Sequence, residues 1–325
     1  MQRHALDRVV LQLKALGIHN VLRFDFPSAP PVESLEHALE LLYALAAIDD
    51  DGRLTRLGAQ CAMLPLSPQL GMALLRANKH NVEPELLSVV AMTSVGQVFG
   101  SATRGTTDHR GFGVYEGDHL SLLNVYNGFA AEQFSPRWCQ KRGVRYKPLL
   151  RAVAIRAQIK KQLKQVRATA KQMELDAAAK KAEAAAQSGN DATYDPFNAT
   201  GAKKKQVTIA LEKDTEPAVI EEKELPSTTT EEEISVRVRK ALVVGLFANA
   251  ACLSRHGSYQ TVRGKESLFI HPSSVLFQRP PKWLIYHQVE FSEKQYMRDV
   301  SQIDSKWLPE LAPHFFAFDT SASAN

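Results

Sequence analysis

Residues 259–303 read YQTVRGKESLFIHPSSVLFQRPPKWLIYHQVEFSEKQYMRDVSQI, and this segment determines how the C-terminal part of the chain can fold. Runs rich in β-branched and aromatic residues predict short strands at 259–263, 268–271, 275–277, 283–291 and 296–303. Glycine and proline residues separate these runs. Five short strands within about 50 residues favour a small closed or partly open barrel, such as an oligonucleotide/oligosaccharide-binding (OB) fold.

The regions that flank these strands have different compositions. Apolar periodicity predicts a connecting helix at 234–253, followed by the barrel at 254–317 and a flexible tail at 318–325. The preceding segment, 168–233, has no apolar stripe: an Ala/Lys/Glu-rich helix is expected at 173–187, and the remainder is polar or acidic. Such a composition forms no packed core, so we expect a long disordered, charged insertion. It is either a solvated tether or a segment that binds a partner.

Helices dominate the first half of the chain. Apolar stripes predict a helical bundle at 67–167, in which Ser67, Pro84 and Asp118 mark the starts of helices. A helix, an acidic turn at 49–52 and a second helix capped by Thr55 suit a winged helix at 27–66. An amphipathic helix closed by Gly17 lies in the segment 1–26. This helix either docks on its own domain or ends a preceding domain, in which case the chain is the C-terminal part of a longer protein.

The overall composition excludes several classes of protein. The chain has 325 residues, 44% hydrophobic and 23% charged, which argues against a wholly disordered chain and against a collagen-like one. Cys61, Cys139 and Cys252 lie far apart without a CxxC pair, so we expect a reducing compartment and no zinc module or disulfide framework. No apolar run reaches the roughly 18 residues of a membrane span.

The basic residues are concentrated in one interval. Between Glu132 and Glu174 there is no acidic residue and there are twelve basic ones, and such a one-sign run repels itself unless an anion neutralises it. A nucleic-acid backbone is the expected anion, although an exposed helix face is the alternative. The candidate nucleic-acid-binding residues here are Arg137, Lys141, Arg142, Arg145 and Lys147.

The predicted barrel mixes cations with aromatic residues. Base stacking combined with neutralisation of the backbone is how OB-folds hold single strands. The candidates in the barrel are Arg255, Tyr259, Arg263, Lys265 and Lys282. Trp283 and Tyr286 are either further stacking residues or members of the core.

Motifs for catalysis are missing from these 325 residues. A phosphate-binding P-loop is absent, because Lys265 precedes Glu266 and position 259 is a tyrosine. We identify no metal ligands, no cofactor-binding residues and no nucleophile motif. His119 is the best isolated candidate for a catalytic group, but a structural hydrogen bond is the role we expect for it.

Several motifs taken together resemble the C-terminal half of a DEAH-box ATP-dependent RNA helicase. The motifs are VLQLKALGI (10–18), ALELLYAL (38–45), LPLSP (64–68), EGDHLSLLNVYN (116–127), GLFANAA (245–251), IHPSS (270–274), WLIYH (283–287) and YMR (296–298). The resemblance implies an α+β multidomain architecture: a winged helix, a helical "ratchet" domain and a five-stranded OB-fold. Segment 1–26 would then be the terminal helix and exit of a RecA-like motor domain.

The same resemblance implies a function. The ratchet and OB-fold would hold single-stranded RNA, while RecA-like domains supply the site for ATP and Mg²⁺; since their motifs are absent here, we expect no ATPase activity from these residues alone. The resemblance is strongest to a spliceosome-associated subgroup, which implies a monomer in the nucleus, or else in the cytoplasm, with glycine-patch activators or spliceosomal proteins as partners. The alternative function is a motorless adaptor that docks such proteins.

Overall fold

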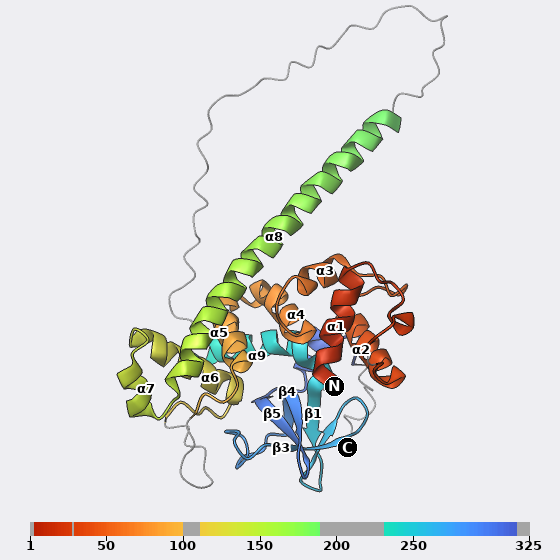
Figure 1. Ribbon diagram of the computed structural model, residues 1–325. Helices are drawn as coiled ribbons and strands as arrows, with labels where there is room; N and C mark the ends of the chain where they lie inside the picture. The colour runs from red at the N-terminus through yellow and green to blue at the C-terminus, as the bar shows by residue number, and fades with distance from the viewer. Residues whose placement is uncertain (1–2, 28, 100–110, 189–230, 317–325) are drawn as a thin grey trace, which may run out of the picture. The chain divides into compact units, whose positions relative to one another are not determined.

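The computed structural model describes residues 3–27, 29–99, 111–188 and 231–316 (Figure 1). Residues 1–168 and 231–325 form one compact unit, and residues 169–230 form another. The first unit joins helices to a closed β-barrel, which confirms the predicted α+β class. Most of the predicted insertion, residues 189–230, and the predicted tail at 318–325 lie outside the described residues.

The N-terminal part contains helices α1 (Arg3–Ala15), α2 (Val32–Ala44) and α3 (Arg56–Ala62), and a 3₁₀ turn at Val21–Arg23. α1 packs on α2 and α3, and its Val10 side chain is fully buried. The helix therefore docks on its own domain; that it also ends a preceding domain stays a prediction. The predicted cap at Thr55 is confirmed, because Thr55 Oγ1 accepts a hydrogen bond from the Gly58 N–H at 2.9 Å.

The helical bundle follows. Its helices are α4 (Pro68–Arg76), α5 (Glu83–Ser94), α6 (Asp118–Ala131), α7 (Pro136–Arg142), α8 (Tyr146–Ser188) and α9 (Glu231–Leu246), with 3₁₀ turns at Ala77–His80 and Phe247–Asn249. Ser67 caps α4 and Pro84 lies in the first turn of α5, as predicted. α8 continues without a break through 168–188, so the helix expected at 173–187 is confirmed.

Helices α4 and α9 approach each other closely because of a glycine. A Cβ atom at Gly245 of α9 would lie 2.1 Å from the backbone oxygen of Gln69 in α4. Real Cβ atoms do not come that close to backbone atoms, so only glycine allows this crossing. The crossing places α9 at the centre of the unit, where it leads directly into the barrel.

The barrel contains β1 (Ala250–Leu253), β2 (Tyr259–Thr261), β3 (Ser267–Ile270), β4 (Trp283–Phe291) and β5 (Gln295–Gln302) in the closed order β1-β2-β3-β5-β4. The pair β3–β5 is parallel and the other pairs are antiparallel. Leu268, Leu284 and Met297 are fully buried in its interior. A short helix, α10 (Trp307–Leu311), follows β5.

Two details of the predicted barrel are wrong. Residues 275–277 form no strand, because the Val275 N–H donates to the Asp118 carboxylate instead of to a neighbouring strand. The missing strand is β1, which occupies residues 250–253 at the predicted end of the connecting helix. Small apolar residues here fit a helix and a buried strand equally well, and only the pairing with β2 and β4 separates the two.

The bundle and the barrel meet at the first turn of α6. Gly117, and not Asp118 as predicted, is the N-cap residue of this helix. The Asp118 carboxylate instead accepts hydrogen bonds from the barrel: from the N–H groups of Val275 at 2.9 Å and Val300 at 3.0 Å, and from Ser274 Oγ at 3.0 Å. Since all of these groups lie on the barrel, Asp118 fastens the helix to it.

His119 forms the neighbouring contact. Its ring is fully buried, and Nδ1 lies 2.8 Å from Ser301 Oγ of β5. Burial lowers the pKa of His119 to about 4, and burial raises the pKa of Asp118 to about 6. Each shift favours the uncharged form of its group. The role we expected for His119, a structural hydrogen bond, agrees with this geometry.

These two shifts predict an unusual pH dependence of stability. Asp118 binds its proton more tightly in the folded state, so its contribution to stability falls as the pH rises from about 4 to 6. The contribution of His119 rises over nearly the same range, because the unfolded state holds that proton more tightly. We therefore expect the two contributions to offset each other in the wild type.

The variant His119→Asn removes the contribution of His119 and keeps that of Asp118. As the pH rises from 4 to 6, the free energy of unfolding of this variant is therefore expected to fall by about 2 kcal/mol more than that of the wild type. Urea unfolding across this range measures the difference, and parallel pH profiles would contradict the assignment. His287 and Asp299 also face this junction, so His287→Asn serves as the comparison variant.

The last described residues return to the first helices. His314 Nε2 lies 2.7 Å from the backbone oxygen of Ala44, and the Phe315 ring lies 5.1 Å from that of Phe247. The winged-helix part, α9 and the C-terminal segment therefore share one core. None of the described helices combines the length and the apolar character that a membrane crossing requires.

Candidate nucleic-acid interface

The predicted cations of the bundle lie close together at α7. Arg137, Lys141 and Arg142 belong to this helix, and Arg145 and Lys147 follow where α8 begins. All five are exposed, and among the described residues none of them forms an ion pair with a carboxylate. We call this group the α7 cluster. Five unneutralised cations on one short segment make a surface that attracts anions.

The backbone holds the α7 cluster in place. Gly143 ends α7 in the left-handed conformation, at φ 67°, so the chain turns sharply between Arg142 and Arg145. The Arg145 N–H donates to the backbone oxygen of Val98 at 2.8 Å, which anchors the turn to the segment that follows α5. The cations on both sides of the turn are therefore presented by a fixed backbone.

Aromatic rings accompany the cations along one connected path. The pairs and their distances from guanidinium carbon to ring centroid are Arg142–Phe112 at 5.6 Å, Arg279–Tyr115 at 4.7 Å and Arg239–Trp307 at 5.3 Å. The segment 112–116 connects all three, because Glu116 accepts a backbone hydrogen bond from Gln302, and Gln302 accepts one from Arg239. We call these three pairs the arginine–aromatic strip.

The barrel residues predicted to bind RNA do not form one surface. Arg255 and Lys282 lie at the same end, since the Leu253 N–H donates to the Lys282 backbone oxygen at 2.9 Å, and both side chains are exposed. Arg263 and Lys265 lie in the turn between β2 and β3, at the other end of β2. Lys265 is exposed, whereas Arg263 forms an ion pair with Glu40 of α2.

Tyr259 is not available for stacking in this structure. Only 2% of the residue is exposed, and its hydroxyl donates to the Pro281 backbone oxygen at 2.5 Å. Its ring fills the barrel, which corrects the prediction of a stacking face. Tyr286 is also buried, while Trp283 is half-buried at the edge of a pocket.

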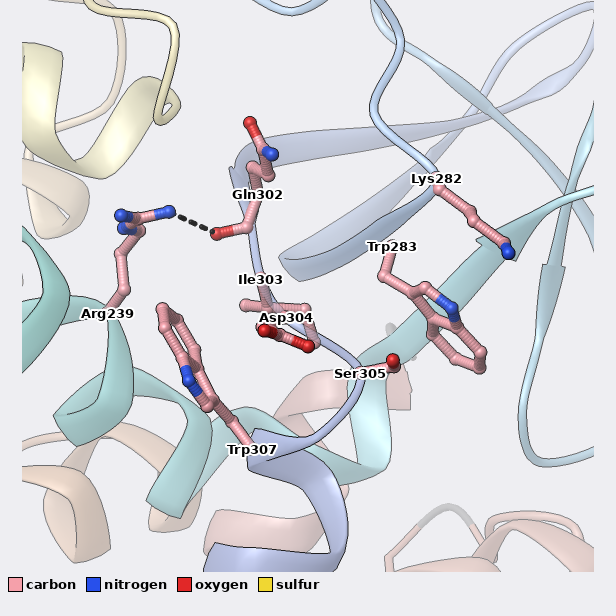
Figure 2. Close-up of a pocket in the computed structure, with 8 residues that line it drawn as sticks. All are labelled: Arg239, Lys282, Trp283, Gln302, Ile303, Asp304, Ser305 and Trp307. Carbon is pink, nitrogen blue, oxygen red and sulfur yellow. Dashed lines mark hydrogen bonds between the residues drawn. The ribbon is translucent and has the colours of Figure 1, made fainter. Parts of the chain in front are cut away.

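That pocket has a volume of about 350 Å³ and lies where α9, the start of β4 and the segment after β5 meet (Figure 2). It is lined by Arg239, Lys282, Trp283, Gln302, Ile303, Asp304, Ser305 and Trp307. Arg239 and Trp307 belong to the arginine–aromatic strip, so the pocket lies at one end of the strip. It combines two indole rings with two cations.

Sequence reasoning missed five of the six residues in the strip. These five residues come from four separate parts of the chain: Phe112 and Tyr115 lie three positions apart, and Arg239, Arg279 and Trp307 are each far from them and from one another. In the sequence these residues appear only as isolated arginines and isolated aromatic residues. They indicate a binding surface only once the fold brings each arginine next to its ring.

The described residues offer little for catalysis. Among the ranges that the structure describes, no group of three His, Cys, Asp or Glu side chains could hold a metal ion. Burial raises the pKa of the Cys61 thiol to about 12, so this cysteine stays protonated.

Comparison with known proteins agrees with this architecture. Family models match at residues 38–66 (helicase-associated domain HA2, winged-helix), 67–122 (HA2, ratchet-like) and 238–315 (OB-fold). Relatives named "Probable ATP-dependent RNA helicase DHX35" share 38% identity over 328 residues in Pongo abelii and 37% over 329 residues in Homo sapiens. The chain therefore matches the C-terminal, helicase-associated region of DEAH-box RNA helicases.

The helicase-associated region aligns over nearly its whole length. Each relative matches 99% of the chain, and the chain spans 38% of the length of each relative. The α7 cluster lies beyond the match to the ratchet-like model and is covered by the alignments to the two relatives. Arg239, Lys282 and Trp307 lie inside the match to the OB-fold model.

Proposed function

We propose that this helicase-associated region binds single-stranded RNA through its backbone charge and by stacking, as part of an ATP-dependent RNA helicase. The observation that carries the proposal is the arginine–aromatic strip, which continues from the α7 cluster to the barrel. Arginine planes and aromatic faces both stack on unpaired bases, and unneutralised cations bind phosphates. Neither group reads a particular base, so we propose binding with little sequence preference.

A salt titration tests this function. Fluorescence anisotropy with labelled 12-mers of uridine and of mixed sequence gives the affinity of the 325-residue chain at several salt concentrations. We expect similar affinities for the two strands. A plot of log affinity against log salt concentration should have a slope near −3, which corresponds to about four phosphate contacts at about −0.7 each. Binding that is independent of salt, or absent at low salt, would contradict the proposal.

The finer aspects of the function rest on the sequence resemblance. A role in pre-mRNA splicing and a nuclear location, with a cytoplasmic one as the alternative, follow from the likeness of residues 146–151 and 248–251 to a spliceosome-associated branch. On this proposal the chain acts as a monomer, and ATP with Mg²⁺ is used by motor domains that these 325 residues do not contain. Purified chain is then expected to show no RNA-stimulated ATP hydrolysis.

A second candidate function is the docking of a protein partner. Three apolar side chains near the N-terminal helices are exposed: Leu16 by 79%, Val32 by 61% and Leu22 by 51%. Exposed apolar side chains favour contacts with proteins where they adjoin one another, and these three lie within 17 consecutive residues of the sequence. Glycine-patch activators or spliceosomal proteins are the partners that the resemblance implies, and binding of a glycine-patch peptide after nuclease treatment would support this function.

A further inference from the structure

The pocket beside the barrel has aromatic walls. Trp283 and Trp307 lie on either side of the segment 302–305, and the buried Ile303 lies between them (Figure 2). Both indoles are half-buried: each packs against the main core and also lines the pocket. A partly exposed indole is a surface on which a nucleobase stacks, at a gain of roughly 1–3 kcal/mol per base.

Two cations stand at the edge of these walls. The Arg239 guanidinium lies over the Trp307 ring and donates to the Gln302 backbone oxygen at 3.3 Å, and Lys282 precedes Trp283 on the other side. Among the described residues no carboxylate forms an ion pair with either cation. Both are therefore available to an anionic group that enters the pocket.

One acidic residue shares the pocket. Asp304 Oδ1 accepts a hydrogen bond from the Lys306 N–H at 3.0 Å, and its side chain is exposed. The two cations outnumber this carboxylate, so the pocket carries a net positive charge. The Asp304 charge still repels an incoming phosphate, so removal of this charge should strengthen phosphate binding, whereas removal of either cation should weaken it.

We infer that this pocket binds one nucleotide unit, with the base stacked on Trp283 and the phosphate beside Lys282, while Arg239 attracts the phosphate from across the segment 302–305. The volume of about 350 Å³ falls within the roughly 300–1,000 Å³ of small-molecule sites. A free nucleoside monophosphate and a nucleotide within a strand offer the same chemistry. For a nucleotide within RNA the inference rests on the proposed function, and for a free nucleotide it does not.

Tryptophan fluorescence of the 325-residue chain tests the pocket, with AMP and adenosine as probes. The chain has three tryptophans, and the third, Trp138, is buried in the separate core of α6 and α7. Saturable quenching by AMP is expected in the wild type and in Trp138→Phe. Quenching that disappears in Trp138→Phe would place the ligand elsewhere and overturn the inference.

Charge variants identify the role of the cations. Lys282→Gln is expected to weaken AMP binding about tenfold, and Arg239→Gln, which acts from across the segment 302–305, about threefold. Adenosine binding is expected to weaken by less than about twofold in both variants, because only AMP carries the phosphate. Asp304→Asn is expected to strengthen AMP binding by about threefold, since a repulsive charge is lost. Lys161→Gln, which changes an exposed lysine of α8 outside the pocket, is the control and is expected to leave both affinities unchanged.

The outcomes separate this inference from the proposed function. If AMP fails to quench the wild type and a labelled hexanucleotide fails as well, the pocket binds no nucleotide and the inference is wrong. If only the hexanucleotide quenches the fluorescence, and Arg239→Gln weakens its binding, the pocket binds a nucleotide within a strand and not a free nucleotide. Quenching by AMP without any binding of 12-mers would support the pocket and contradict the proposed function. Equal effects of Arg239→Gln and Lys161→Gln on AMP binding would overturn the assignment of the cations.

Discussion

Replacement of Lys141, Arg142 and Arg145 together by Glu is expected to weaken the binding of single-stranded RNA at least 100-fold at low salt. Each side chain is exposed and carries a charge that no carboxylate of the described residues neutralises. The change removes three cations that could each neutralise a phosphate and adds three repulsive charges to the same surface. The magnitude of the salt slope should fall by about two, and the loss should be alike for different sequences.

A matched control separates local contact from net charge. Lys160, Lys161 and Lys164 are exposed on α8, and their replacement by Glu changes the net charge by the same amount. We expect this variant to lose less than about tenfold, because no aromatic partner accompanies these lysines in the strip. Equal losses in the two triple variants would mean that the α7 cluster is only part of a diffuse positive field.

The substitution Gly245→Ala is expected to lower the free energy of unfolding by about 3 kcal/mol or more. The new Cβ would overlap the Gln69 backbone oxygen, which lies in a helix and cannot rotate away as a side chain would. Helices α4 and α9 would have to separate, and the core that they share with the winged-helix part would lose contacts along its length. Urea unfolding followed by circular dichroism measures the loss.

Gly257→Ala is the control for this prediction. Unlike Gly245, Gly257 has a positive φ, of 77°, and nothing lies within 4 Å of a Cβ placed there. Its replacement should cost only the strain of a left-handed alanine, about 1 kcal/mol. If the two substitutions cost the same, the close crossing of α4 and α9 is not the reason that glycine is needed at position 245.

Local patterns in the sequence were enough to predict most of the helices. The caps at Thr55 and Ser67 each depend on a backbone N–H three residues further along the chain, so the residue types at these two positions are enough to predict the helix starts. The barrel was predictable as a class because turn residues separate its apolar runs. β1 was not, because its strand character comes from partners in β2 and β4 and not from its own residues.

The candidate site was less predictable than the fold. The α7 cluster was visible because its charges adjoin each other in the sequence, and charge needs no partner to be recognised. Tyr259 and Arg263 were predicted to bind RNA from their residue types alone. In the structure, Tyr259 donates a hydrogen bond to the Pro281 backbone oxygen, and Arg263 forms an ion pair with Glu40. A single sequence does not reveal these contacts, because the partner of Tyr259 lies 22 residues away and the partner of Arg263 lies in another domain.

The return of the C-terminal segment to the first helices affects how the protein is made. The contact between His314 and Ala44 joins residues 270 positions apart, and Ala312 belongs to the same core as the winged-helix residues. Synthesis of those intervening residues at roughly 5–20 residues per second takes about 15–50 s. During that interval the nascent winged helix lacks part of its covering and exposes apolar surface to the cell. Chaperone binding to the nascent chain should therefore persist until the last core residues emerge from the ribosome.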